Sequence, residues 1–247
     1  MRTSTASVAP ARSGIEPRLP VADVIRDAIR QRLLAPGAPL VQSALAEALG
    51  VSKIPVREAL HSLAAEGLVT FTDEGARVTL LAPEEIHELW SLRALVEPAL
   101  ADAIVRNAGP SDLAAIRRLV EDMDTASDGD EWSDLNYVFH LELYRIAALP
   151  QFASVATRVL TMIEPYSRVA VNRLEGQAAA QAEHRELIEA IERGDPAALR
   201  EVLERHSTRA RDLLAGYAER EASSAPSLSA TSRAARSFAA RLRGDPV

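Results

Sequence analysis

Residues 83–221 carry the sequence feature that most limits the fold, because their apolar side chains recur every three to four residues with no strand-like alternation. This period is that of an amphipathic helix. Short clusters rich in glycine, proline or aspartate, which favour turns, interrupt it at 109–110, 128–130, 149–150 and 194–196. They leave helical segments at 84–107, 111–124, 131–148, 151–171, 177–193 and 196–220. Long helices joined by short turns run antiparallel, so we expect an all-α antiparallel helical bundle over residues 83–221.

The preceding segment, residues 18–82, shows a different order of patterns. Three helical patterns are followed by two alternating ones, at 21–34, 42–49, 53–66, 69–72 and 76–80. Gly50 and Gly67 supply helix stops, Ser52 is a suitable N-cap, and Pro55 is tolerated in a first helical turn. Three helices followed by a β-hairpin predict a winged helix-turn-helix, so the whole chain is expected to be mainly α.

The third helix of this segment carries Lys53, the only lysine in the chain. Lys53 and Arg57 are four residues apart and therefore share one helical face. No acidic residue occurs from 50 to 57, as expected where phosphates approach. Two cations near a helix start are also common on solvated surfaces. The turn, the cap and the hairpin together nevertheless favour a recognition helix that enters the major groove of DNA.

The distribution of charge also separates the two parts of the chain. The net charge of −7 argues against a protein that binds nucleic acid over its whole surface. Residues 18–83 contain seven cationic and seven acidic side chains, whereas residues 84–218 contain 14 cationic and 24 acidic ones. This difference is expected if only the first part meets a polyanion.

Composition excludes several other kinds of protein. The absence of cysteine excludes disulfides, thiolate metal sites and a cysteine nucleophile. No apolar run approaches the ~18 residues that span a bilayer. Residues 1–17 resemble a disordered arm and not a signal peptide, because they lack an apolar core. Residues 222–247 are expected to be a disordered tail in which 234–242 could form a short basic helix. We therefore expect a cytoplasmic protein with no membrane partner.

Three of the five histidines fall on the apolar stripes of different bundle helices. His140 follows Asn136 by four residues on one stripe, and His184 and His206 lie on the stripes of the last two helices. A single buried histidine is more often a core residue with a hydrogen-bond partner. Three together leave several ring nitrogens to satisfy. A divalent transition metal would satisfy them, with zinc favoured and nickel or manganese as alternatives.

The first part of the chain also carries the motifs of a known family. PGAPL, LAEALGVSKIPVREALHSLAAEGLV and GARV follow one another in register. With this order, the segment resembles the DNA-binding domain of the GntR family of bacterial transcription regulators. The resemblance implies that Ser52, Lys53, Ile54 and Arg57 face a double-stranded DNA operator, and that the hairpin tip touches the minor groove.

The segment departs from the family pattern at three places. Lys53 stands where arginine is usual, and its point charge reads guanine less rigidly than a bidentate guanidinium. Ser43 occupies a position where relatives often carry an arginine that binds phosphate. The hairpin tip, Asp73-Glu74, is acidic and would repel phosphate, so we expect weak contact between this wing and DNA.

The bundle resembles the FCD effector-binding domain found in the FadR-like branch of GntR regulators, through LNYVFH, EHRELIEAIERGD and His206. Many members of that branch hold a divalent metal with one aspartate and three histidines. The resemblance therefore implies a metal set of Asn136, in place of the aspartate, with His140, His184 and His206. Effectors in the branch are commonly small carboxylates that complete the coordination of the metal.

Two arginines are candidates for binding such a carboxylate. Arg93 lies on an apolar stripe and could clamp the anion with its guanidinium, although a helical pair with Glu97 is an equal alternative. Arg168 is a second candidate. His61 and His87 lie on other faces and are expected at the surface.

These observations predict a ligand-responsive transcription regulator, expected to be a repressor that binds its operator as a homodimer. One alternative is a metal-responsive regulator in which the metal itself is the effector. A metalloenzyme is a further alternative, because a metal with an open position can activate water. The sequence argues against it, since Glu142 and Glu183 fall off the apolar stripes and no inward carboxylate is evident as a general base.

Overall fold

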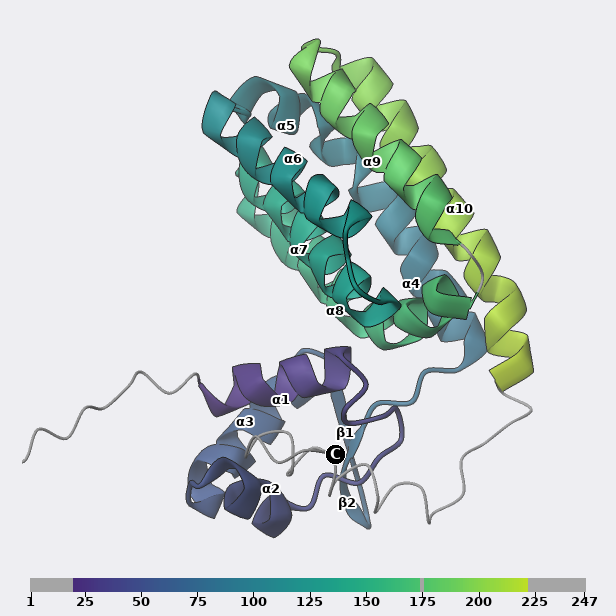
Figure 1. Ribbon diagram of the computed structural model, residues 1–247. Helices are drawn as coiled ribbons and strands as arrows, with labels where there is room; N and C mark the ends of the chain where they lie inside the picture. The colour runs from purple at the N-terminus through teal and green to yellow at the C-terminus, as the bar shows by residue number, and fades with distance from the viewer. Residues whose placement is uncertain (1–19, 174–175, 222–247) are drawn as a thin grey trace, which may run out of the picture.

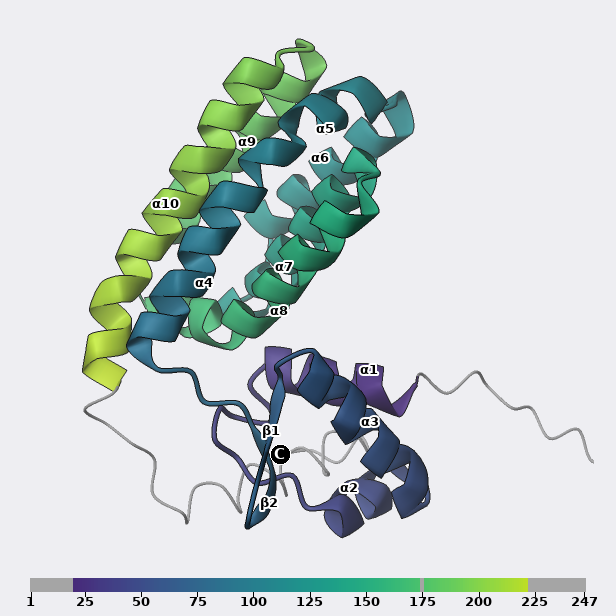
Figure 2. The same cartoon turned by 180° about the vertical axis from the view of Figure 1, so that it is seen from behind.

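The structure, a computed structural model, describes residues 20–173 and 176–221. It consists of a small N-terminal unit and an elongated bundle of helices that stands on it (Figure 1; Figure 2 shows the opposite side). The expectations for the arm at 1–17 and the tail at 222–247, including a basic helix at 234–242, lie outside the described residues. None of the described helices is long and apolar enough to cross a membrane.

The N-terminal unit is the predicted winged helix-turn-helix. Its elements are α1 (Val21–Arg30), α2 (Gln42–Leu49), α3 (Lys53–Ala65), β1 (Val69–Thr72) and β2 (Gly75–Val78). The two strands pair antiparallel, with Val69 opposite Val78. Side chains that the helical period places on one face form the core, among them Ile25, Ile29, Leu60 and Leu63, each at most 1% exposed. Apolar burial of this kind is the main stabilising term for so small a unit.

The first helix is shorter than predicted, because it ends at Arg30. Arg32 adopts the left-handed conformation, with φ of 58°, which reverses the chain. The N–H of Leu34 then bonds back to the carbonyl of Ala28 at 3.0 Å. Leu34 is thereby returned to the core, where it is only 2% exposed. Its apolar side chain is buried by this reversal and not by a continued helix.

The bundle confirms the predicted all-α architecture. Its elements are α4 (Pro83–Val96), the 3-10 turn η1 (Pro98–Leu100), α5 (Ala101–Asn107), α6 (Pro110–Asp124), α7 (Gly129–Ala147), α8 (Pro150–Arg173), α9 (Gly176–Glu192) and α10 (Pro196–Glu221). The single helix predicted at 84–107 is broken at Pro98, which lacks an N–H donor and clashes with the preceding turn. Pro165, by contrast, lies inside α8 without ending it.

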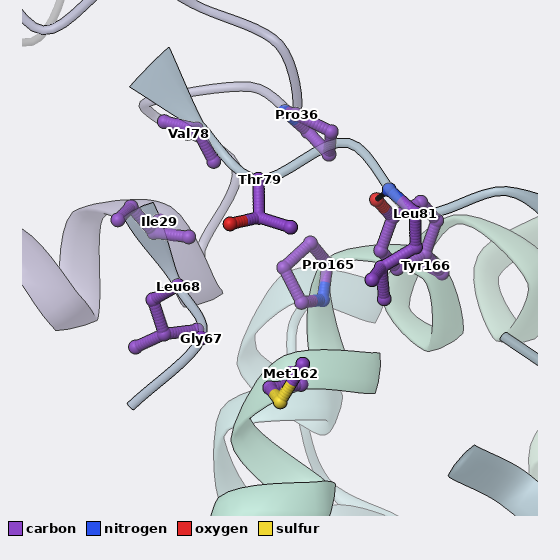
Figure 3. Close-up of a pocket in the computed structure, with 10 residues that line it drawn as sticks. All are labelled: Ile29, Pro36, Gly67, Leu68, Val78, Thr79, Leu81, Met162, Pro165 and Tyr166. Carbon is purple, nitrogen blue, oxygen red and sulfur yellow. Dashed lines mark hydrogen bonds between the residues drawn. The ribbon is translucent and has the colours of Figure 1, made fainter. Parts of the chain in front are cut away.

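The two units meet where α1 and the hairpin approach α8. Figure 3 shows the narrow crevice between them, with Met162 and Pro165 of α8 opposite Gly67 and Thr79 of the N-terminal unit. Gly67 has φ of +85°, and a Cβ there would lie 3.1 Å from Cε of Met162. A guanidinium N–H of Arg32 donates to the carbonyl of Pro165 at 3.1 Å. The N-terminal unit therefore packs against α8 through close contacts between side chains of one unit and backbone of the other.

Candidate nucleic-acid interface and candidate metal and effector centre

The four residues predicted to face DNA lie together at the start of α3. Ser52, Lys53, Ile54 and Arg57 are all exposed, and Ile54 is 60% exposed although it is apolar. Ser52 has the extended backbone of an N-cap but makes no side-chain capping hydrogen bond, which differs from the expected cap. The first backbone N–H groups of α3 therefore have no partner from Ser52, and such groups are suited to phosphate.

The hairpin tip is as acidic in space as in sequence, since Asp73 and Glu74 are both exposed. Glu74 forms an ion pair with Arg77 on β2. This pair reduces the repulsion of phosphate but leaves the tip without a free cation of its own. Weak contact between this wing and DNA stays a prediction.

Three histidines from three different helices converge inside the bundle. His140 of α7, His184 of α9 and His206 of α10 are 0%, 0% and 4% exposed. One ligand nitrogen from each can be chosen so that the three atoms lie within 4.8 Å of one another. The remaining histidines, His61 and His87, are exposed as predicted.

Hydrogen bonds orient two of these rings. Nδ1 of His184 lies 3.0 Å from Oε1 of Gln181, whose amide nitrogen donates to the carbonyl of Val120 at 3.0 Å. Nδ1 of His206 lies 2.7 Å from a carboxylate oxygen of Glu183. Because Gln181 and Glu183 accept these hydrogen bonds, the ring proton of each histidine lies on Nδ1, and the free lone pair lies on Nε2. Nε2 of His184 is buried with no hydrogen-bond partner among the described residues.

Burial also sets the charge of the cluster. It holds the pKa of His140 and of His184 well below the ordinary value, and nearby cationic side chains lower both further. Burial lowers the pKa of His206 too, against the opposing effect of Glu183. Neutral imidazole is the form that binds a metal.

Arg93 enters the same core, at 3% exposure. Its Nε donates to Glu97 at 2.8 Å, so the helical pair considered from sequence is present. Its Nη2 also lies 2.9 Å from Nε2 of His140. Burial alone would raise the pKa of Glu97, but Arg93, Ser207 and Tyr144 outweigh it, and the pKa of Glu97 is lowered. A buried, ionised Arg93–Glu97 pair therefore borders the histidine cluster.

Arg168 is directed elsewhere. It is 4% exposed, donates to the backbone and side chain of Asp130 at 2.9 and 3.1 Å, and also bonds to Asp134. Its Nη2 lies 3.8 Å from Glu164. Protein carboxylates thus occupy this guanidinium, and the structure does not bring it together with the histidines as sequence reasoning expected.

A cavity of about 50 Å³ opens beside the cluster. Residues from five helices line it, including Trp90, Arg93, Trp132, Asn136, Glu164 and His206. Oδ1 of Asn136 is buried and has no hydrogen-bond partner among the described residues. The lining of the cavity therefore includes the guanidinium groups of Arg93 and Arg209 and the carboxyl group of Glu164.

The expectation that no carboxylate points inward is wrong. Glu97, Glu164 and Glu183 are 1%, 2% and 6% exposed. Each lies four residues from a buried position of its own helix, at Arg93, Leu160 and Leu187, and periodicity missed all three because it counts only apolar side chains. The spacing of Glu97 from Arg93 was the one available signal, since a buried arginine needs an anion.

The residues present fit a divalent transition metal. His184 and Asn136 each leave a buried donor atom unsatisfied, and two of the three imidazoles are oriented through Nδ1 by second partners, as in many metal sites. Against this, the guanidinium of Arg93 lies beside His140. Glu97 balances the charge of Arg93, but the N–H of Arg93 donates to the ring of His140, so His140 would bind a metal only after this guanidinium moves away.

Comparisons with known proteins match two families along the chain. Residues 88–209 match the FCD domain, and residues 17–78 match the family described as bacterial regulatory proteins, gntR family. An uncharacterized HTH-type transcriptional regulator in an unstable DNA locus of Streptomyces ambofaciens is 31% identical over 175 residues, which are 70% of this chain and 74% of that protein. The chain belongs to the GntR family. Its helical bundle is an FCD domain, as in the FadR-like branch.

This GntR regulator is also similar to a second curated protein and to a solved structure. A probable D-xylose utilization operon transcriptional repressor of Paenarthrobacter nicotinovorans is 29% identical, covering 76% of this chain and 86% of that protein. The solved structure of McbR/YncC from E. coli superposes with a TM-score of 0.70 at 24% identity, covering 80% of this chain and 98% of that one, which shows the shared fold. The matched families and relatives are transcriptional regulators, so the metalloenzyme alternative is excluded.

Proposed function

We propose that this GntR regulator is a homodimeric repressor whose DNA binding is controlled by a small carboxylate held at a metal centre. Residues 18–82 would bind DNA, and residues 83–221 would bind the effector and form the dimer. A regulator of this kind acts where the DNA is, and we propose the cytoplasm as its compartment. The relative in Paenarthrobacter is described as a repressor, which supports that direction of control.

On the DNA side, the exposed residues of α3 support the proposal. Lys53 and Arg57 would read base edges or phosphates, and Ile54 would make apolar contact with a thymine methyl group. In a dimer, two such helices would enter successive major grooves about one helical turn apart. A near-palindromic operator follows from that two-fold symmetry.

On the effector side, one observation carries the proposal: among the described residues, Nε2 of His184 and Oδ1 of Asn136 are buried without hydrogen-bond partners, and Asn136 lines the cavity together with His206. Together with His140 and His206 they would hold a divalent transition metal, with zinc favoured and nickel or manganese as alternatives. A bound metal would supply Lewis acidity that anchors a carboxylate. Arg93 would orient the same anion with its guanidinium.

The contacts between the two units suggest how the signal travels. Glu164 of the cavity lies beside Arg168, which bonds to Asp134, and Asp134 also accepts from Arg30 of α1. Effector binding that changes the position of Glu164 would alter this series of ion pairs. The effector must bind one arrangement of the units more tightly than the other, since only differential affinity shifts a population.

The test is to select DNA that the purified, metal-loaded protein retains and to measure its affinity over a salt series. A sequence-specific complex whose affinity falls log-linearly with salt is expected. Small carboxylates added to that complex should change its affinity, and substitution of Arg93 by alanine should abolish the change. A complex that no carboxylate alters would overturn the effector assignment and leave DNA binding intact.

The metal-responsive alternative is separated by the same assay. If the metal itself is the effector, chelation changes operator affinity in the absence of any carboxylate. If the metal only anchors the effector, chelation leaves the affinity of the free protein for DNA unchanged and abolishes the response to carboxylate.

A further inference from the structure

Four residues that line the bundle cavity each leave a buried polar atom without a hydrogen-bond partner among the residues that the structure describes. The atoms are Nε1 of Trp90, Nε1 of Trp132, Oδ1 of Asn136 and Oε1 of Glu164. Buried polar groups in proteins are nearly always bonded, because leaving one unsatisfied costs free energy. Four such atoms around a single cavity indicate that its occupant is polar on more than one side.

The types of these atoms define the occupant further. An indole N–H only donates, so Trp90 and Trp132 require acceptor oxygens. Glu164 is only 2% exposed. Its Oε1 has no hydrogen-bond donor in reach among the described residues, since the guanidinium of Arg168 lies 3.8 Å away. When it is ionised, Glu164 repels a second carboxylate. It is suited to a hydroxyl or an amine.

Charge restricts where the groups of such a ligand can lie. Arg93 and His206 line the cavity from α4 and α10, and Glu164 lines it from α8. An anionic group is therefore favoured toward Arg93 and disfavoured toward Glu164. The cavity of about 50 Å³ holds only a few water-sized groups at ~10–15 Å³ each, which suits a short chain.

We infer that the effector is a short-chain carboxylate that carries a hydroxyl or amino group, and that Glu164 accepts a hydrogen bond from that group. Glu164 thereby determines which carboxylates the regulator binds and responds to. This inference rests on the proposed function and adds the second recognition element of the same site. It also connects ligand identity to the N-terminal unit, because Glu164 is the member of the interdomain series of ion pairs that lines the cavity.

The test uses the two tryptophans as reporters, since they are the only ones in the sequence and both line the cavity. Metal-loaded full-length protein is titrated with propionate, 3-hydroxypropionate and 3-aminopropionate while intrinsic fluorescence is followed. The three acids differ only in the group at the far end. We expect 3-hydroxypropionate or 3-aminopropionate to bind at least about tenfold more tightly than propionate. The acid that binds more tightly identifies whether a hydroxyl or an amino group donates to Glu164.

Variants assign that preference to Glu164. Glu164→Leu should abolish it, leaving the three acids equal. Glu164→Gln, which preserves shape and an acceptor oxygen, should retain a hydroxyl preference and lose an amine preference, and it keeps the test informative if the leucine variant fails to fold. Glu201→Gln, at an exposed carboxylate of α10, is the control and should leave all three affinities unchanged.

Three results would overturn the inference in distinguishable ways. Equal binding of the three acids to the unmodified protein would reject a donor subsite while leaving a carboxylate effector in place. A preference that persists in Glu164→Leu would reject Glu164 as its cause. Failure of all three acids to bind protein with a full complement of metal would reject the carboxylate effector itself, and with it this inference.

Discussion

Arg30 of α1 and Asp134 of α7 are joined across the boundary between the two units, with Nη1 of the arginine 2.6 Å from Oδ1 of the aspartate. The guanidinium also stacks on the ring of Tyr137 at 4.6 Å. Asp134 accepts a second guanidinium, from Arg168, which lies beside Glu164 of the cavity. One half-exposed carboxylate thus links the N-terminal helix to the helices that line the candidate effector site.

Replacement of Asp134 by asparagine should weaken that link. Arg30 and Arg168 are buried and would lose a charged partner, at a cost of roughly 1–3 kcal/mol; this is below the 3–5 kcal/mol of a fully buried pair because Asp134 is 40% exposed. Carboxylate binding should be retained and its effect on operator affinity reduced, as measured by chemical unfolding and by fluorescence anisotropy. Asp27→Asn removes the partner of Arg30 on its own helix and is the control. An unchanged effector response in Asp134→Asn would exclude this route.

Replacement of Arg57 by alanine should weaken specific DNA binding. Loss of one base contact typically costs about 1–3 kcal/mol, which is about 5- to 150-fold in affinity. Metal content and thermal stability should not change, since the side chain is exposed. Arg106→Ala removes an exposed arginine of α5 and serves as the matched control. Equal losses in the two variants would indicate a general electrostatic effect and not recognition by α3.

Metal binding should depend on the converging side chains. His184→Ala is expected to lose bound metal on dialysis, and Asn136→Asp to hold it more tightly because a carboxylate replaces an amide oxygen. Elemental analysis and competition with a chelator measure both. His87→Ala, at an exposed histidine of α4, should retain the metal of the unmodified protein. Full metal content in His184→Ala would show that the metal binds elsewhere, and an unmodified protein that retains no metal would reject the metal centre itself.

The contribution of Glu164 to the stability of the metal-free protein should fall as the pH rises from about 4.5 to about 7, whereas the three buried histidines, whose pKa is lowered, contribute in the opposite direction. Burial raises the pKa of Glu164 to about 7, against Arg168, Arg30 and Arg93, which lower it, while Asp134 raises it. The folded state therefore binds the proton of Glu164 more tightly than the unfolded state does. The resulting stabilisation is fully present at a pH below the pKa of the unfolded state, and it is lost as the pH rises through the pKa of the folded state. The total is at most about 3 kcal/mol.

Glu164→Gln isolates this effect, because glutamine resembles the protonated carboxyl. It should match the unmodified protein near pH 4.5 and exceed its unfolding free energy at pH 8. Urea unfolding across that range measures the difference. Glu201→Gln, at an exposed carboxylate of α10, is the control variant. A difference for Glu164→Gln that is constant with pH would mean that the carboxyl does not titrate in this window.

Gly67 should be sensitive to substitution for a reason that lies in the neighbouring unit. Gly67→Ala meets left-handed strain, about 1–2 kcal/mol, and also forces Met162 to shift. Gly194→Ala meets the strain alone, since nothing lies within 4 Å of a Cβ there. The unfolding free energy should fall further for Gly67→Ala. Combining it with Met162→Ala should relieve the excess, and additive losses would show that the two residues do not interact.

Local patterns accounted for most of the fold. Helix and strand periods, with glycine and proline at the breaks, specified the order and type of the elements, because these signals act within a few residues along the chain. The same stripes indicated that His140, His184 and His206 lie inward, since an inward position on each helix follows from its own period. Their convergence within 4.8 Å needed the packing of α7, α9 and α10 against one another.

What the sequence by itself determined, then, is a winged helix-turn-helix followed by an FCD bundle, with the exposed cations on α3 and the three inward histidines. Tertiary structure alone decided the rest. Glu97, Glu164 and Glu183 are buried although they are charged, and Arg168 is bound by Asp130 and Asp134 and does not line the cavity. The physical reason is common to all of them: a charged side chain is buried where a partner from another helix compensates its desolvation, and that partner is set by packing and not by position along the chain.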